Sequence, residues 1–270
     1  MESLLRALKL HTVCQEARCP NIGDCFSKGT ATFFILGDLC TRNCRFCAVK
    51  KGRPLPPDGE EPERVAQAAQ KLKLRHVAIT SVARDDLSDG GASHFALTIR
   101  KVKTLNPGAT VEVLVPDFGG RLSSLNEVLE AGPDVLNHNL ETVPRLYPLV
   151  RPRASYRRSL NLLKMAKGRG TIIKSGLILG LGESREEVLS TIGDLREIRT
   201  DILTMGQYIR PSRRQLEVKE YLPPESFSAY KEEALQIGFR FVSSGPFVRS
   251  SYRAKEALDA IKEKEAVDHH

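Results

Sequence analysis

All six cysteines of this 270-residue chain lie between positions 14 and 47, and they divide into two groups of three. The first group has the spacing C-x4-C-x5-C and the second has the spacing C-x3-C-x2-C. A closed structural zinc site uses four ligands, and a four-iron cluster has one ligand position on each iron. A site with only three thiolates therefore leaves one metal position open for chemistry. The two groups are Cys14, Cys19 and Cys25, and Cys40, Cys44 and Cys47.

Two other readings of the cysteines stay open at this point. Disulfides that stabilise a chain of this length would be spread along it, whereas no cysteine follows Cys47. Zinc sites completed by histidine are the second reading. His11 lies near the first group, but no histidine follows Cys47 closely. The crowding of thiols at one end favours metal or cluster ligation in a reducing compartment.

The second cysteine group directly follows a strand-like apolar run, residues 32–36, and Phe46 precedes its last cysteine. This arrangement resembles the defining motif of the radical S-adenosylmethionine (SAM) superfamily. The resemblance implies that Cys40, Cys44 and Cys47 are catalytic and hold a [4Fe–4S] cluster whose open iron binds SAM. It also implies that an electron from the cluster cleaves SAM to methionine and a 5′-deoxyadenosyl radical.

Strand-like and helix-like segments alternate after Lys50. Six consecutive βα units predict a parallel sheet with right-handed crossovers, and they are fewer than the eight of a complete barrel. We therefore expect an α/β fold, a partial (β/α)6 TIM-like barrel of the radical SAM type over residues 31–243. An N-terminal extension (1–30) and a C-terminal extension (244–270) flank it. The expected strands are, in order, 32–36, 76–81, 110–115, 134–139, 171–181 and 201–207, followed by a last short strand at 239–243. The expected helices are 63–74, 95–104, 122–131, 155–167, 183–199 and 224–237.

Polar residues and glycines follow several of these strands, at the end of a barrel where active sites lie. The resemblance to the superfamily implies that some of them bind SAM or substrate. Helix caps and glycine turns are the structural alternative. The candidate cofactor-binding residues are Asp89, Gly90 and Gly91 after the second strand, Asn137 and Glu141 at the fourth, and Gly180, Gly182 and Glu183 at the fifth.

Further stretches resemble the lipoyl synthase family, over residues 4–254. They are the two cysteine groups taken together, residues 16–23 around the second cysteine, the segments 80–87 and 89–92, and Arg249-Ser250-Ser251-Tyr252 near the end. The resemblance implies that two sulfur atoms are inserted into the octanoyl chain of an octanoyl-lysine on a lipoyl carrier protein. It further implies an auxiliary [4Fe–4S] cluster on Cys14, Cys19 and Cys25 that donates the sulfur. Ser251, preferred over Ser250, would be its oxygen ligand and a catalytic residue.

The net charge of +8 favours an acidic partner, but charge alone does not identify it. The family resemblance implies an octanoylated lipoyl domain or the glycine-cleavage H protein, and an electron donor such as ferredoxin or flavodoxin. The absence of basic runs interleaved with aromatics argues against nucleic acid, and the short apolar runs argue against a membrane partner. We expect a cytoplasmic protein, or an organellar one in a eukaryote.

Three alternative functions remain at this stage. One is another radical SAM sulfur-inserting enzyme of the biotin synthase or methylthiotransferase kind. A second is a non-catalytic iron–sulfur carrier, and a third is a zinc-containing nucleic-acid-binding protein. The first cysteine group and the terminal Arg-Ser-Ser-Tyr argue against the first, and the glycine motifs on one rim argue against the second.

Overall fold

An eight-stranded sheet forms the centre of the computed structural model, which describes residues 1–27 and 30–268, with side chains up to residue 265. The strand order is β1-β2-β5-β6-β7-β8-β9-β10, and β1 is antiparallel to β2 while every other pair is parallel. The strands are β1 (His11–Thr12), β2 (Thr32–Ile35), β5 (His76–Ser81), β6 (Thr110–Leu114), β7 (Val135–Asn137), β8 (Ile172–Leu179), β9 (Ile202–Gln207) and β10 (Phe241–Ser244), with β3 (Leu39–Cys40) and β4 (Lys50–Lys51) as a separate pair.

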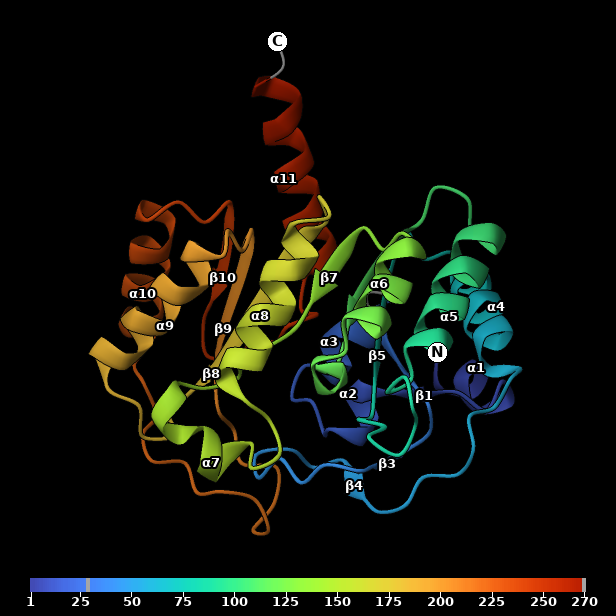
Figure 1. Cartoon of the computed structure of the whole chain (residues 1–270), viewed down its shortest axis with the longest axis horizontal. Helices are drawn as coiled ribbons and strands as arrows, with labels where there is room; N and C mark the ends of the chain where they lie inside the picture. The colour runs from blue at the N-terminus through green and yellow to red at the C-terminus, as the bar shows by residue number, and fades with distance from the viewer. Residues whose placement is uncertain (28–29, 269–270) are drawn as a thin grey trace.

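Helices surround this curved sheet, as Figure 1 shows, and β1 and β10 form its two edges. The expectation of a partial barrel is therefore confirmed, with one more parallel strand than the six βα units and an added antiparallel edge strand. The α-helices are α1 (Glu2–Ala7), α2 (Val13–Glu16), α3 (Ile22–Ser27), α4 (Glu61–Lys71), α5 (Ala92–Leu105), α6 (Leu122–Glu130), α7 (Tyr147–Val150), α8 (Tyr156–Lys167), α9 (Arg185–Glu197), α10 (Pro224–Gln236) and α11 (Ala254–Asp268), with short 3₁₀ turns at Phe118–Gly120 and Pro144–Leu146.

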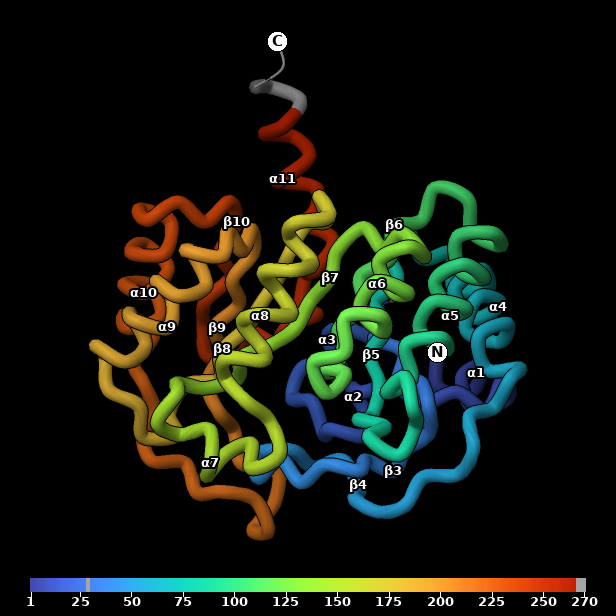
Figure 2. The backbone as a smooth tube through the Cα atoms, in the orientation of Figure 1, coloured from blue at the N-terminus to red at the C-terminus, as the bar shows by residue number. Residues whose placement is uncertain are grey.

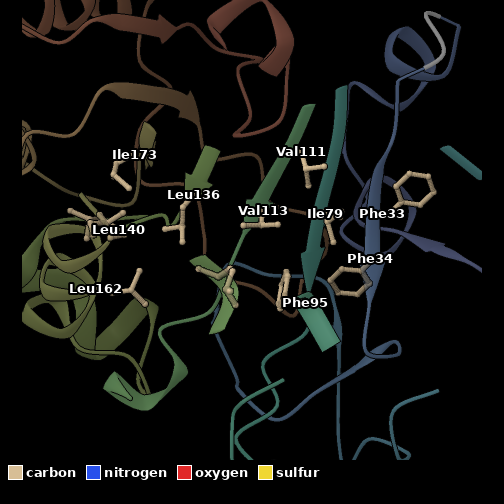
Figure 3. Close-up of a cluster of buried hydrophobic side chains, with 14 of the residues drawn as sticks. Phe33, Phe34, Ile79, Phe95, Val111, Val113, Leu136, Leu140, Leu162 and Ile173 are labelled. Carbon is tan, nitrogen blue, oxygen red and sulfur yellow. The ribbon is translucent and has the colours of Figure 1, made fainter. Parts of the chain in front are cut away.

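The main core lies between the sheet and the helices. Phe33, Ile79 and Val113 occupy neighbouring positions on β2, β5 and β6 and are completely buried. Phe95 of α5 and Leu162 of α8 belong to the same cluster, which Figure 3 shows spreading along the sheet. Because strand residues alternate between the two faces, the remaining positions of these strands point into the barrel and are available for a site.

Local chemistry sets the start of α9 two residues later than the sequence suggested. Ser184 is the N-cap, and Ser184 and Glu187 form a reciprocal capping box that satisfies two free backbone N–H groups. Glu183 therefore stays outside the helix. Its carboxylate accepts hydrogen bonds from the backbone N–H groups of Gly180 and Leu181.

Both ends of the chain meet at the barrel. The N-terminal segment adds β1 to the sheet edge, and Asn21 Nδ2 donates a 2.6 Å hydrogen bond to the carbonyl of Phe247. In α11, Leu258 and Ile261 pack against Val135 and Ile202 inside the barrel. Figure 2 shows α11 at the opposite end of the molecule from β3 and β4. Residues 28–29 and 269–270 of the proposed extensions lie outside the described residues.

A buried ion pair crosses the barrel interior between the end that holds α11 and the end that holds β3 and β4. Lys174 Nζ of β8 lies 2.9 and 3.0 Å from the carboxylate oxygens of Glu112 on β6, and both side chains are almost fully buried. Asn137 Nδ2 of β7 donates a further hydrogen bond of 3.3 Å to Glu112. The pair separates the apolar packing around α11 from the polar end of the barrel.

Removing one partner of this pair is expected to be much worse than removing both. Lys174→Met leaves a buried carboxylate uncompensated and should lower the free energy of unfolding by about 3–5 kcal/mol. The double variant Glu112→Gln with Lys174→Met should recover most of that loss. Urea denaturation of the metal-free protein measures the effect. Lys101→Met, which removes an exposed pair with Glu63, is the control and should leave the unfolding midpoint unchanged. Equal stability of the two Lys174 variants would contradict this interpretation.

Candidate active site

A cavity of about 370 Å³ opens within the barrel and joins the two cysteine groups. All three cysteines of the first group line it, as does Cys47 of the second. The C-terminal segment contributes Arg249, Ser250 and Ser251 to the same wall. Segments more than 200 positions apart in the sequence therefore meet at one site.

Strand pairing and backbone hydrogen bonds hold the second cysteine group. Cys40 ends β3, and its Sγ accepts contacts of 3.4 Å from the backbone N–H groups of Arg42 and Ala83. The carbonyl of Cys47 accepts a hydrogen bond of 3.2 Å from Gln215 Nε2. The loop after β9 therefore packs against the cysteine loop and fixes its last residue.

An ion-pair network fixes the same loop from the other side. The Arg42 guanidinium binds Asp85 through two hydrogen bonds of 2.7 and 2.8 Å, and its Nη2 lies 2.6 Å from Asp117. Arg158 Nε lies 2.7 Å from the other oxygen of Asp117. Burial would raise the pKa of Asp117, but Arg42 and Arg158 outweigh it and hold that pKa well below its usual range. Asp117 therefore stays charged and ties the cysteine loop to β6 and α8.

The cysteines have the chemistry that iron–sulfur clusters require. Cys14, Cys19, Cys40, Cys44 and Cys47 are free thiols. Loss of solvent raises the pKa of Cys14 and Cys44, and it raises the pKa of Cys47 to about 12. These three thiols therefore keep their protons until a positively charged metal ion displaces the protons, so metal loading is coupled to proton release.

Within residues 1–27 and 30–268, no group of three or more His, Cys, Asp or Glu side chains is arranged to hold a single metal ion. This finding is compatible with a four-iron cluster, because each thiolate of such a cluster binds a different iron and the sulfurs need not converge on one point. The three thiols of each cysteine group therefore fit a four-iron cluster.

The C-terminal segment reaches the cavity because β9 carries a glycine at one position. A Cβ on Gly206 would lie only 2.0 Å from the carbonyl oxygen of Val248. Two residues further on, Ser250 Oγ accepts a 2.6 Å hydrogen bond from Asn139 Nδ2. Ser251 lines the cavity beside it. The two serines therefore have different surroundings.

Asn139 and Glu141 form the polar wall of the cavity. Asn139 Nδ2 also donates a 3.0 Å hydrogen bond to Glu141, while its Oδ1 is buried without a protein partner in the described structure. Gly176 lies against this oxygen, since a Cβ there would be 3.0 Å from it. Loss of solvent raises the pKa of Glu141, although the charge of Arg151 acts in the opposite direction. The wall therefore offers one free acceptor and one carboxyl group whose pKa lies above its ordinary value.

Of the sequence-predicted cofactor residues, only Glu141 lines the cavity. Asn137 lies deeper, bound to Glu112. Asp89 caps α5 by accepting hydrogen bonds from the N–H groups of Gly91 and Ser93, and Gly90 packs against Phe118. The structure gives these residues structural contacts, and their contact with SAM remains a prediction.

The glycines after β8 also have structural contacts. A Cβ on Gly180 would lie 2.3 Å from both Gln207 Nε2 and the carbonyl of Glu220, so this position needs glycine. Gly182 has a φ of +105°, a conformation that glycine adopts without strain. Glu183 binds the backbone of the turn between them. Their role toward SAM likewise remains a prediction.

Sequence reasoning did not assign Asn139, Gly176 or Gly206 to the site. The alternation of side chains along a strand was a usable signal for Asn139, which is two residues beyond Asn137. Gly176 pairs with Thr204, and Gly206 pairs with Ile178, in the register of β8 and β9. The two glycines leave space for neighbouring groups, Asn139 beside Gly176 and Val248 beside Gly206. That need for space can be seen only once the neighbouring segments are in place.

Comparison with known proteins defines the class of this site. Residues 34–195 match the radical SAM superfamily. Among solved structures, Streptococcus suis SuiB bound to S-adenosylmethionine is similar, with a TM-score of 0.63 and 14% identity over 90% of this chain and 59% of SuiB. Methylornithine synthase (PylB) has a TM-score of 0.53 and 15% identity over 87% of this chain and 81% of PylB. The chain has the radical SAM fold.

Curated sequences narrow the class to one family. The lipoyl synthase of Caldanaerobacter subterraneus subsp. tengcongensis is 59% identical over 97% of this chain and 93% of its own length. The lipoyl synthase of Pyrobaculum calidifontis is 58% identical over 93% of this chain and 88% of its own. That of Chlorobium limicola is 53% identical over 95% and 89%. The chain belongs to the lipoyl synthase family. None of the described helices has the length and apolar character needed to cross a membrane.

The Arg42 network predicts a defect in cluster retention. In a chain with Cys14, Cys19 and Cys25 replaced by Ala, Arg42→Ala should weaken iron binding by the second group roughly tenfold, as loss of an outer-shell partner does. Iron content after anaerobic reconstitution and gel filtration measures it. Lys50→Ala, which removes the exposed pair with Asp38 on the same loop, is the control and should retain the parent's iron. Equal iron loss in both variants would show that Arg42 has no special role.

Proposed function

We propose that this chain inserts two sulfur atoms into the octanoyl group of an octanoyl-lysine carrier, with the two cysteine groups holding two [4Fe–4S] clusters. The observation that carries the proposal is the single cavity onto which Cys14, Cys19, Cys25 and Cys47 open together with Ser251. Membership of the lipoyl synthase family supports the reaction, SAM and the clusters as cofactors.

The reaction explains why two thiol groups share one cavity. An alkyl C–H bond is neither acidic nor electrophilic, so side-chain acid–base catalysis alone does not open it. When bound, SAM and its cluster supply a carbon radical for this step, and the auxiliary cluster supplies sulfur. The protein's task is to keep the octanoyl chain between the two sources, because a substrate radical must meet sulfur before it meets anything else.

The cavity walls suit that task. Leu114, Leu177 and Ile178 provide an apolar lining for an alkyl chain. Asn139 and Glu141 provide polar groups on one wall. We assign Asn139 Oδ1 as an acceptor for a donor group of SAM, since it is otherwise an unpaired buried acceptor. Arg151 keeps this wall in place by donating hydrogen bonds to the carbonyls of Asn139 and Leu140.

We assign Ser251 as the fourth ligand of the auxiliary cluster. Both serines line the cavity with the three cysteines of the first group, but Ser250 already accepts a hydrogen bond from Asn139 Nδ2. A hydroxyl binds iron more weakly than a thiolate, since oxygen is a harder ligand and must lose a proton. A weak ligand leaves one corner of a cluster open to a substrate radical.

The partners follow from the reaction. The substrate protein is a lipoyl carrier, either an octanoylated lipoyl domain or the glycine-cleavage H protein. A low-potential one-electron donor such as ferredoxin or flavodoxin completes the requirements. The net charge of +8 favours an acidic carrier and raises the association rate with it through complementary charge.

One assay tests the function. Anaerobic incubation with SAM, a reductant and an octanoylated lysine peptide should yield the lipoyl peptide and 5′-deoxyadenosine, both measured by mass spectrometry. The reconstituted protein should contain about eight irons per chain. Cys44→Ala should abolish deoxyadenosine formation. Cys14→Ala is the matched variant and should still form deoxyadenosine while losing the lipoyl product. Saturation near four irons, with Cys14→Ala unchanged, would contradict the assignment.

The neighbouring serines provide the sharpest test of the auxiliary site. Ser251→Ala and Ser251→Cys should both still cleave SAM but lose most of the lipoyl product. Ser250→Ala, the matched control, should lose about 1 kcal/mol of stability through its hydrogen bond and keep the product. Product yield and deoxyadenosine are measured in the same reaction. A normal yield from both Ser251 variants would sink the ligand assignment.

A further inference from the structure

The loop between β9 and α10 carries a group of arginines beside the active-site cavity. Arg210 and Pro211 line that cavity, and Arg213 and Arg214 follow them closely and are exposed. Figure 2 shows this loop, in orange, at the same end of the molecule as β3, β4 and α7. We call residues 210–215 the arginine turn.

The cavity meets solvent beside this turn. Arg18 and Pro20 of the N-terminal segment line the cavity and are also exposed, and the side chain of Arg210 is 30% exposed. Residues that both line a cavity and reach solvent mark the place where it opens. Cations from two distant segments of the chain therefore border the opening.

Hydrogen bonds within the arginine turn fix its shape. The Arg210 guanidinium donates to the carbonyl of Gln215 at 3.0 Å and to that of Arg213 at 2.7 Å. Ser212 Oγ donates to Gln215 Oε1 at 2.6 Å and accepts from the Arg214 N–H at 3.3 Å. The backbone that carries Arg213 and Arg214 is therefore held by groups other than their own guanidinium groups, which remain available to a partner.

The turn is also anchored to the second cysteine group. Gln215 Nε2 donates to the carbonyl of Cys47 at 3.2 Å, and the Leu216 N–H donates to the carbonyl of Arg45 at 3.0 Å. The Arg45 N–H in turn donates to the carbonyl of Val150 at 2.9 Å. Arg45 is exposed, so it brings a third free guanidinium group beside the turn.

These arginines are close together without compensating charge. In the part of the chain that the structure describes, no carboxylate oxygen lies within 4.0 Å of the Arg45, Arg213 or Arg214 side chains. Arg210 has only Glu217, at 3.9 Å, and the Glu217 side chain is 71% exposed. Like charges held near one another cost stability. An ordered turn that gathers them gains nothing from them in folding, which points to a ligand.

The other carboxylates of these loops do not offset this charge. Asp38 lies 3.1 Å from Lys50 Nζ, and Glu220 is next to Lys219 in the sequence. Each of these carboxylates has a cation of its own, so the arginines leave the surface at the opening positively charged. Such a surface suits a partner with an acidic face.

We propose that the arginine turn, together with Arg45, is the docking surface for an acidic face of the carrier protein around its octanoyl-lysine. The proposal rests on the proposed function, in which the octanoyl chain enters the active-site cavity. The lysine arm is a single side chain, so the surface of the carrier must come to the cavity opening. Guanidinium groups there bind the carrier's carboxylates through paired hydrogen bonds.

An electron-donor protein with an acidic face is the other candidate for this surface. The position of the turn favours the carrier, because Arg210 and Pro211 line the cavity itself. Only the carrier has to insert a group into that cavity. An electron reaches a cluster through protein and does not need the opening.

The test compares two substrates with the holoenzyme and with dithionite as the only reductant. One is an octanoylated lipoyl domain with an acidic surface, and the other is a short octanoyl-lysine peptide without acidic residues. The double variant Arg213→Gln with Arg214→Gln should lower kcat/KM for the domain about tenfold at low salt, because complementary charge speeds association. The peptide has no acidic face, so its turnover should match that of the unmodified chain.

Binding supplies a readout besides activity. The association rate of the fluorescently labelled octanoylated domain should fall as salt is raised for the unmodified chain, and much less so for the double variant, because salt screens the arginines. Arg75→Gln with Arg100→Gln is the matched control. It removes the same charge from two exposed arginines, one directly before β5 and one within α5, that line no part of the active-site cavity. Its rates and salt dependence should follow the unmodified chain.

The possible failures can be told apart. Equal rates of the double variant and the control with the octanoylated domain would overturn the proposal. So would an equal loss with the peptide, or a loss that appears only when flavodoxin replaces dithionite, which would assign the turn to the electron donor. If the unmodified chain forms no lipoyl product from either substrate, the proposed function itself fails. If it forms product and the double variant treats both substrates normally, only the docking surface is wrong.

Discussion

The close approach of the Val248 carbonyl to Gly206 is the contact on which the rest of the site depends. The barrel is an open sheet, and the interior beside β9 must be filled by another segment. Any side chain at position 206 would force the C-terminal segment away by clashing with its backbone. With that segment displaced, Arg249, Ser250 and Ser251 would leave the cavity, and Phe247 would lose its hydrogen bond with Asn21. The first cysteine group depends on the same contact, since Asn21 lies between two of its members.

Charged side chains divide the barrel along its length. The buried pair of Lys174 and Glu112 lies between the apolar packing of α11 and the polar cavity. At the other end, Arg42 and Asp117 hold the second cysteine loop. Buried charges are costly without partners, and each of these four has an oppositely charged partner.

The division of labour between the two serines follows from the same geometry. Ser250 is held by Asn139, which also binds Glu141, so the polar wall and the C-terminal segment form one hydrogen-bonded unit. Ser251 lines both this cavity and a second one behind Cys25. The ligand role proposed for it therefore falls on a residue at the boundary between the two cavities.

Much of this protein was determined by sequence alone. The cysteine spacing identified the chemistry because metal ligation needs particular residue types at short, local intervals, and βα alternation predicted the partial barrel because periodicity is also local. What the sequence did not decide were the contacts between distant segments. It suggested SAM contacts for Asn137 and for the glycines after β5 and β8, and these stay predictions beside the packing and hydrogen-bond contacts that the structure shows. Its candidate residues left out Asn139, Gly176 and Gly206, because their importance depends on what packs against them. Only the tertiary structure, which fixes those neighbours, shows that Ser250 is hydrogen-bonded to Asn139 and that a second cavity lies behind Cys25.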